Sequence, residues 1–234
     1  MFPQVPDPTA PPYVPPSAFA SGLGLPAFEA VPLLGPGRAP TAVAGNGSGG
    51  PDAVLAELIA GNARFVAGAP RFGHSVTAAV AAAARLPSAA VVGCMDARVP
   101  VEAVFDQDVG NVCVVRSAAE VLDRGVLASV EFAVETLGVS LVLVLGHSRC
   151  AAITAAVTAA RTGDVPPGHR GYAVQEIWPA IPEAALARDD VEGLVTRRHA
   201  ERVADRLRAL LGEGRVRVVA GHYDVTTGRV GILS

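Results

Sequence analysis

Four short runs of apolar, mostly β-branched residues recur along the chain, separated by longer stretches with helical spacing. The runs lie at 89–93, 112–115, 141–145 and 216–220. Strands that are apolar at every position are typical of parallel sheets with both faces covered. Helices are expected at 100–106, 123–138, 151–162, 173–187 and 192–211. The alternation predicts an α/β fold with a mainly parallel central sheet of four strands flanked by helices.

The sequence also predicts the first and last elements of the folded part of the chain. From Asp52, a good N-cap residue, apolar positions recur at helical spacing up to Gly68. An Ala-rich helix is expected at roughly 76–85, and a short fifth strand at 229–233 after the turn at 226–228. We therefore expect a single domain over 52–234.

Residues 1–50 have a different composition. They hold 11 of the 19 prolines and three charged residues, and they end in a glycine-rich stretch. This predicts a Pro/Gly/Ala-rich tail and flexible linker that builds no core of its own. Two further interpretations stay open: a polyproline II ligand around 12–15, and docking of the tail's apolar side chains on the domain.

Composition narrows the function. The chain has 234 residues, half of them hydrophobic, so one core can form without disulfides. Lys+Arg (19) and Asp+Glu (22) give a net charge of -3 and no basic stripe, so no nucleic acid partner is expected. No apolar run reaches membrane-spanning length and the first residues do not resemble a signal peptide, so no membrane association is expected. Three cysteines, an odd number, favour a cytoplasmic protein.

A candidate metal site is formed by three residues that follow two of the predicted strands. Cys94 and His147 come just past the runs 89–93 and 141–145, and Cys150 follows His147 at i+3. In open α/β sheets, ligands bind outside the carboxyl ends of the strands, so the two half-sites are expected to meet. Two thiolates and one imidazole suit Zn²⁺ and leave the fourth tetrahedral position open for chemistry. We expect one Zn²⁺ per subunit.

Asp96 and Arg98 stand two residues apart, directly after Cys94, and carry opposite charges. Zinc held by two thiolates is formally uncharged, so its water is less acidic than at a three-histidine site and needs further support. An ionised Asp96, paired with Arg98, can accept a hydrogen bond from zinc-bound hydroxide. If Arg98 releases it, Asp96 can instead take the fourth zinc position and close the site. The sequence leaves open which of the two holds.

Other cysteines and histidines receive plainer interpretations. Cys113, among valines, is expected in the core. A disulfide or redox pair of Cys94 with Cys150 would leave Asp96 and Arg98 without a role. The remaining histidines lack metal-ligand spacing and are expected at the surface or satisfied in the core, with His74 and His222 as candidates for carrying protons: His74, His169, His199 and His222.

The two half-motifs resemble those of the β-class carbonic anhydrases of bacterial type, with C-x-D-S-R followed some fifty residues later by H-x-x-C. The segments 61–68, 125–134 and 223–228 are also similar to family elements, so the resemblance covers about 52–233. It implies that Cys94, His147 and Cys150 bind zinc, that Asp96 and Arg98 orient the reactants, and that the chain is a carbonate dehydratase, a lyase. The implied reaction is the reversible hydration of CO2 to bicarbonate by zinc-bound hydroxide.

The resemblance also implies two substrate-binding positions and an assembly. Gln107 looks like a glutamine that donates a hydrogen bond to substrate in some members, often across a dimer interface; capping of a surface turn is the alternative. Ala151 stands where the family's backbone N–H is thought to face substrate. Family members are dimers or dimers of dimers, so we expect at least a homodimer.

Three departures from the family pattern bear on the reaction. Ala97 replaces serine, Ala151 replaces glycine, and the stretch 117–120 brings Ala119 and Glu120 where glycine-containing sequences are usual. Two alternatives therefore accompany the main hypothesis. One is a hydrolase of carbonyl sulfide or carbon disulfide on the same site. The other is a catalytically silent zinc domain whose tail binds a partner, against which the intact Asp96 and Arg98 argue.

Overall fold

The computed structural model describes residues 50–72, 75, 86–212, 214 and 216–233. The predicted tail, apart from Gly50, and the predicted Ala-rich helix at 76–85 lie outside these residues. Among the described residues, no helix is both long and apolar enough to cross a bilayer.

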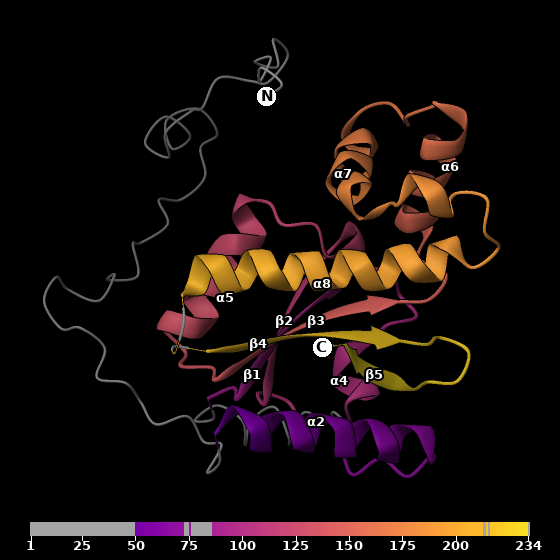
Figure 1. Cartoon of the computed structure of the whole chain (residues 1–234). Helices are drawn as coiled ribbons and strands as arrows, with labels where there is room; N and C mark the ends of the chain where they lie inside the picture. Colours follow the sequence, from indigo (N-terminus) through magenta and orange to yellow (C-terminus); the bar gives the residue numbers. More distant parts are fainter. Residues whose placement is uncertain (1–49, 73–74, 76–85, 213, 215, 234) are drawn as a thin grey trace, which may run out of the picture. The chain divides into compact units, whose positions relative to one another are not determined.

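The centre of the domain is a five-stranded sheet with strand order β2-β1-β3-β4-β5 (Figure 1). Its strands are β1 Ala89–Cys94, β2 Val112–Ser117, β3 Leu141–His147, β4 Arg217–Tyr223 and β5 Val230–Leu233. The first four run parallel, and β5 pairs with β4 in the antiparallel sense. The predicted fold class is confirmed. Strands β1 and β3 are buried along their whole length, which explains their uninterrupted apolar sequences.

Helices cover both faces of the sheet (Figure 1). On one face, α5 (Arg124–Glu135) and α8 (Val191–Leu211) pack on Ala90, Val92 and Val142. On the other, α2 (Pro51–Val66) and α4 (Val101–Val104) pack on Val91 and Leu143. The alternation of side chains along each strand sends successive residues to opposite faces, so each strand contributes to two cores.

A third apolar cluster lies beyond the carboxyl end of β3. It is built from α6 (Ala151–Thr162), α7 (His169–Ile177) and the beginning of α8, and it includes Cys94 and Cys150. The prediction of one helix over 173–187 was wrong. The helix α7 begins earlier and ends at Ile177, and two 3-10 turns follow, Trp178–Ala180 and Glu183–Ala185. Pro179 and Pro182 explain the break, because proline lacks the N–H that a continuing helix needs.

Smaller corrections concern single residues. Gly50, not Asp52, is the N-cap of α2, because Pro51 occupies the first helical position. Asp52 lies in the first turn and forms an ion pair with Arg217. Cys113 is only half-buried, since β2 is an edge strand, so its assignment to the core was too strong.

Helix α2 is fixed to the domain by Asn62. Its side-chain amide donates to the carbonyl oxygens of Val104 (3.0 Å) and Gly228 (2.8 Å), and its oxygen accepts from the N–H of Val230 (2.9 Å). Gly61, the residue before Asn62, lets α2 approach α4 very closely. A Cβ at this position would lie 1.7 Å from the carbonyl oxygen of Phe105. The approach of α2 to α4 therefore requires glycine.

Candidate metal centre

Cys94, His147 and Cys150 meet at the carboxyl ends of two neighbouring strands. Cys94 is the last residue of β1, His147 the last of β3, and Cys150 the N-cap of α6. The strands pair in parallel, which brings their final residues side by side. All three side chains are buried, and their ligand atoms lie within 4.8 Å of one another. The two half-motifs thus form one constellation.

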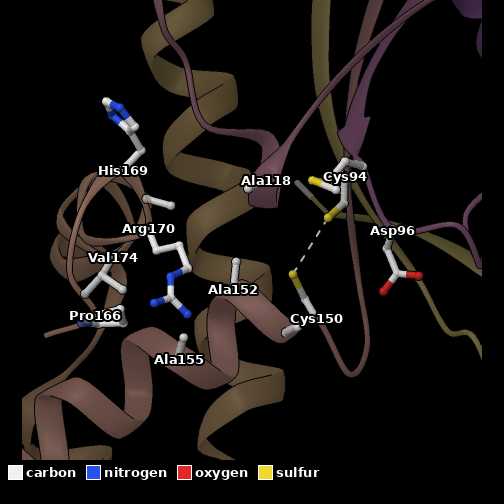
Figure 2. Close-up of a pocket in the computed structure, with 13 residues that line it drawn as sticks. Cys94, Asp96, Ala118, Cys150, Ala152, Ala155, Pro166, His169, Arg170 and Val174 are labelled. Carbon is white, nitrogen blue, oxygen red and sulfur yellow. Dashed lines mark hydrogen bonds between the residues drawn. The ribbon is translucent and has the colours of Figure 1, made fainter. Parts of the chain in front are cut away.

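The separation of the sulfurs fits a shared tetrahedral ion. Two sulfurs bound to zinc at about 2.3 Å in tetrahedral geometry lie about 3.8 Å apart. The Sγ atoms of Cys94 and Cys150 are 3.9 Å apart, and both cysteines are free (Figure 2). A disulfide would need about 2.05 Å. The arrangement therefore corresponds to a dithiolate ligand pair rather than to a disulfide.

His147 is prepared to act as a ligand. Its Nδ1 lies 2.9 Å from the carbonyl oxygen of Ser148. Since a carbonyl can only accept, Nδ1 carries the proton and Nε2 presents a lone pair. Nε2 is buried and has no hydrogen-bond partner among the described residues. An unpaired buried nitrogen is costly, and a metal ion beside the two sulfurs would satisfy it.

The sulfur of Cys94 lies in surroundings that favour negative charge. The N–H of Ala119 donates to the Sγ of Cys94 at 3.4 Å. The hydrogen bond between the two sulfurs lowers the pKa of the Cys94 thiol and raises the pKa of the Cys150 thiol. Cys150 also stands at the N-terminus of α6, where the helix dipole favours an anion.

Asp96 faces this centre and is held by Arg98. The guanidinium donates from Nε to Oδ1 (3.0 Å) and from Nη2 to Oδ2 (2.7 Å), and the Arg98 backbone N–H donates to Oδ1 (2.9 Å). These hydrogen bonds, the side-chain ones first, hold the pKa of Asp96 well below its usual range. Asp96 Oδ2 lies 4.0 Å from Nε2 of His147. The carboxylate is thus ionised, oriented and adjacent to the metal-binding atoms.

A further arginine supports the turn after β1. Arg116, in β2, donates from Nε to the carbonyl oxygen of Cys94 at 2.8 Å and from Nη2 to that of Asp96. Sequence reasoning assigned it no role. The sequence gives one indication of a role for Arg116: it directly precedes the stretch 117–120, which departs from the family pattern.

An apolar cavity of about 640 Å³ opens beside the candidate ligands (Figure 2). Among the residues that line it are Cys94, Asp96, Ala118, Cys150, Ala151, Ala155, His169 and Arg170. Figure 2 shows the Arg170 guanidinium, which comes from α7, directed toward Ala152 and Ala155 of α6. Arg170 has no hydrogen bond or ion pair with any other described residue. An unpaired cation in an apolar wall is suited to attracting an anion.

The other predicted substrate residue lies elsewhere. Gln107 is buried, and its side-chain amide donates to the carbonyl oxygen of Phe105 at 2.9 Å. It does not line the cavity that holds Cys94 and Cys150 within the same chain. Ala151, by contrast, lines that cavity as the first residue of α6.

The residues that depart from the family pattern are tightly packed. Ala119 and Glu120 both adopt the left-handed conformation (φ 51° and 57°) and both are buried. Glu120 Oε1 has no hydrogen-bond partner among the described residues. Burial, and secondarily the negative charge of Cys94, raises the pKa of Glu120 well above its ordinary value. These surroundings favour the neutral acid over an added negative charge near the sulfurs.

The histidines outside the constellation separate into distinct surroundings. His169 is exposed at the cavity, whereas His199 is buried with Nε2 at 2.7 Å from the carbonyl oxygen of Ala119. His222 is half-buried, and its Nε2 has no partner in the described part of the chain. His74 lies outside the described residues. Of the two surroundings expected for these histidines, surface or satisfied core, His199 has the second and His169 the first.

Fold and site together are those of the β-class carbonic anhydrase family, and comparison with known proteins agrees. The family model described as carbonic anhydrase matches residues 89–230, so the chain belongs to this family. The protein is 43% identical over 133 residues to carbonic anhydrase 2 of Mycobacterium tuberculosis, a match that covers 56% of this chain and 64% of that relative. It is 38% identical over 194 residues to a carbonic anhydrase of Mycolicibacterium smegmatis, covering 79% of this chain and 94% of the relative.

Solved structures show the same fold. A β-carbonic anhydrase of Coccomyxa in complex with acetazolamide superimposes with a TM-score of 0.59 at 22% identity, covering 67% of this chain and 77% of that one. One of the structures described as two tetrameric β-carbonic anhydrases from Sordaria macrospora gives a TM-score of 0.54 at 21% identity, covering 78% and 92%.

Proposed function

We propose that this protein is a zinc-dependent carbonic anhydrase that interconverts CO2 and water with bicarbonate and a proton. The observation that carries the proposal is the convergence of the unpartnered Nε2 of His147 with two sulfurs, beside a carboxylate held by Arg98. A structural zinc site has no use for an oriented, ionised Asp96 at its edge.

Each residue has a distinct part in this proposal. Cys94, His147 and Cys150 hold the metal, which when bound supplies a Lewis acid that makes water a nucleophile at neutral pH. Asp96 accepts the hydrogen bond of the attacking oxygen and thereby orients it toward the carbon of CO2. Arg98 keeps Asp96 ionised and turned so that it does not itself enter the metal site.

The cavity can accept both CO2 and bicarbonate, for different physical reasons. Its apolar walls, which include Ala118, Ala151 and Ala155, accept uncharged CO2 without any desolvation of polar groups. Bicarbonate is an anion, and Arg170 offers it an unpaired cation in the same wall. The N–H of Ala151, at the start of α6, is a further donor for the product.

We also propose that the protein works as a homodimer or dimer of dimers in the cytoplasm. The edge strand β2 leaves Cys113, Val114 and Val115 only half-buried, and the nearby residue Phe132 is 58% exposed. An apolar strand edge that pairs with no other strand among the described residues is a surface that proteins normally cover. In such an assembly Gln107 would serve the partner's site. Sedimentation velocity measures the mass directly.

The experiment that tests the function combines metal analysis with stopped-flow CO2 hydration on the same purified protein. About one zinc per chain together with rapid hydration supports the proposal. Full zinc occupancy with no hydration contradicts it. Carbonyl sulfide is assayed in parallel, because hydrolysis of that substrate with CO2 left untouched would assign the site to a different reaction.

A further inference from the structure

A buried histidine on the long helix α8 is connected to the candidate ligand Cys94 through one residue. His199 Nε2 lies 2.7 Å from the carbonyl oxygen of Ala119, 80 positions away in sequence. Because a carbonyl only accepts, the ring must carry its proton on Nε2. Burial lowers the pKa of His199 and so favours the neutral ring, in which Nε2–H is the one donor. The direction of this hydrogen bond is therefore fixed.

Ala119 is held from both sides. Its N–H donates to the Sγ of Cys94 at 3.4 Å, while its carbonyl accepts from His199. The residue has φ 51° and ψ 45°, and Glu120 follows at φ 57°. The left-handed region is unfavourable for a residue that carries a Cβ. Two such residues in succession persist only where surrounding contacts fix them, and the hydrogen bonds of Ala119 are contacts of that kind.

We propose that His199 is a positioning residue for the metal centre: by holding the carbonyl of Ala119, it keeps the N–H of Ala119 directed at the sulfur of Cys94. This inference rests on the ligand part of the proposed function and not on the reaction. Neither His199 nor Ala119 touches substrate in this account.

The N–H matters because the candidate ligand set contains two thiolates. A hydrogen bond to a thiolate withdraws negative charge from the sulfur and fixes its orientation. Loss of an outer partner of a metal ligand typically costs 10–100-fold in metal affinity or activity. If the hydrogen bond from His199 to the carbonyl oxygen of Ala119 is lost, the strained Ala119 can relax and turn its N–H away from Cys94.

A purely structural role is the competing explanation, because His199 also fills space between α8 and the turn 118–120. The two roles separate by substitution. Glutamine places its Nε2 the same number of bonds from Cα as the histidine Nε2, so His199→Gln can still donate to Ala119. Asparagine reaches only as far as the histidine Nδ1, so His199→Asn cannot. His199→Phe keeps the volume and loses the donor.

The matched control is Thr196→Val in the same helix. Thr196 is as buried as His199, and within the described part of the chain its side chain donates only to the carbonyl oxygen of Glu192 in its own helix (2.8 Å), so the change perturbs α8 without touching Ala119. Zinc release from each holoenzyme is followed with an excess of a coloured chelator. The cobalt-substituted proteins are compared by their sulfur-to-cobalt charge-transfer absorption. Both readouts are independent of CO2 hydration.

The expected result is a roughly 10–100-fold faster zinc release and a shifted charge-transfer band in His199→Phe and His199→Asn. His199→Gln and Thr196→Val should stay near the parent protein. Equal behaviour of His199→Gln and His199→Asn overturns the proposal even if His199→Phe fails to fold. Absence of hydration in the parent, with the Gln and Asn variants still separated, would refute the proposed reaction and leave this inference standing.

Discussion

Arg98 links the two halves of the candidate site. Its guanidinium binds both carboxylate oxygens of Asp96, and Nη2 also donates to the carbonyl oxygen of Arg149 at 2.9 Å. Arg149 directly precedes Cys150 and has a positive φ of 57°. One side chain thus orients the carboxylate that follows β1 and fixes the backbone that presents a ligand after β3.

Replacement of Arg98 should damage catalysis more than metal binding, because its side chain makes two hydrogen bonds to Asp96 and only one to the backbone before Cys150. In Arg98→Ala, Asp96 is free to turn toward the metal, and we expect CO2 hydration to fall roughly 10–100-fold while zinc stays bound. Metal analysis and stopped-flow hydration on the same sample check this. Arg124→Ala, at the exposed start of α5, is the control. Loss of zinc in parallel with activity would show that Arg98 maintains the ligands instead.

Removal of the positive charge of Arg170 should weaken bicarbonate binding and leave the reaction of neutral CO2 nearly unchanged. In Arg170→Gln we expect inhibition of hydration by added bicarbonate to weaken roughly threefold, a modest effect because the guanidinium is exposed to solvent. The rate at low CO2 should hardly change. Arg124→Gln alters the net charge equally at a site away from the cavity. The idea fails if both variants show the same bicarbonate inhibition as the parent protein.

Gly61, the glycine of α2, should not tolerate a side chain. A Cβ at this position meets the carbonyl oxygen of Phe105 at 1.7 Å, and a backbone atom cannot move aside cheaply. We expect Gly61→Ala to lower the free energy of unfolding by about 3 kcal/mol. Gly193→Ala in α8, where a Cβ has nothing within 4 Å, should raise it by about 0.5 kcal/mol. Urea unfolding of both variants measures the contrast, and equal destabilisation would contradict the close approach.

The buried Asp106 should make stability depend on acid. Burial alone would raise its pKa, but hydrogen bonds from Arg64 and from the backbone N–H groups of Arg71 and Phe72 bring the pKa below the ordinary value. With the folded pKa below the unfolded one of about 3.9, the stabilisation is complete above about pH 4 and is lost as the pH falls through the folded value.

Asp106→Asn is therefore expected to cost about 3 kcal/mol at pH 7, as for a buried pair that loses one partner. The difference from the parent protein should shrink below pH 4. Unfolding curves at a series of pH values give both numbers. A difference that stays constant down to pH 3 would mean that the charge of Asp106 contributes nothing.

Much of the fold follows from sequence because the central strands are buried on both faces. The runs at 89–93 and 141–145 are apolar throughout, and the structure extends them to Cys94 and His147. The prediction of a helix at 173–187 was wrong because it followed the helical spacing of apolar residues and disregarded the prolines at 179 and 182. These prolines end α7 and leave only short turns.

The candidate ligands were predictable for a related reason. Parallel neighbouring strands end at the same edge, so two motifs fifty residues apart must meet there. Arg170 and His199 carried no such signal. They reach the site from α7 and α8, and their partners or surroundings are set by how those helices pack rather than by any spacing along the chain.

The central claim is that Cys94, His147 and Cys150 hold a zinc ion that hydrates CO2. Stopped-flow hydration by Cys94→Ser, set beside Cys113→Ser and with zinc measured on each, tests it most directly. Cys113 lies on the edge strand away from the candidate ligands, so the same substitution there controls for the loss of a thiol. The account predicts that Cys94→Ser loses zinc and hydration together while Cys113→Ser keeps both. Hydration that survives in Cys94→Ser at the parent's rate would contradict it.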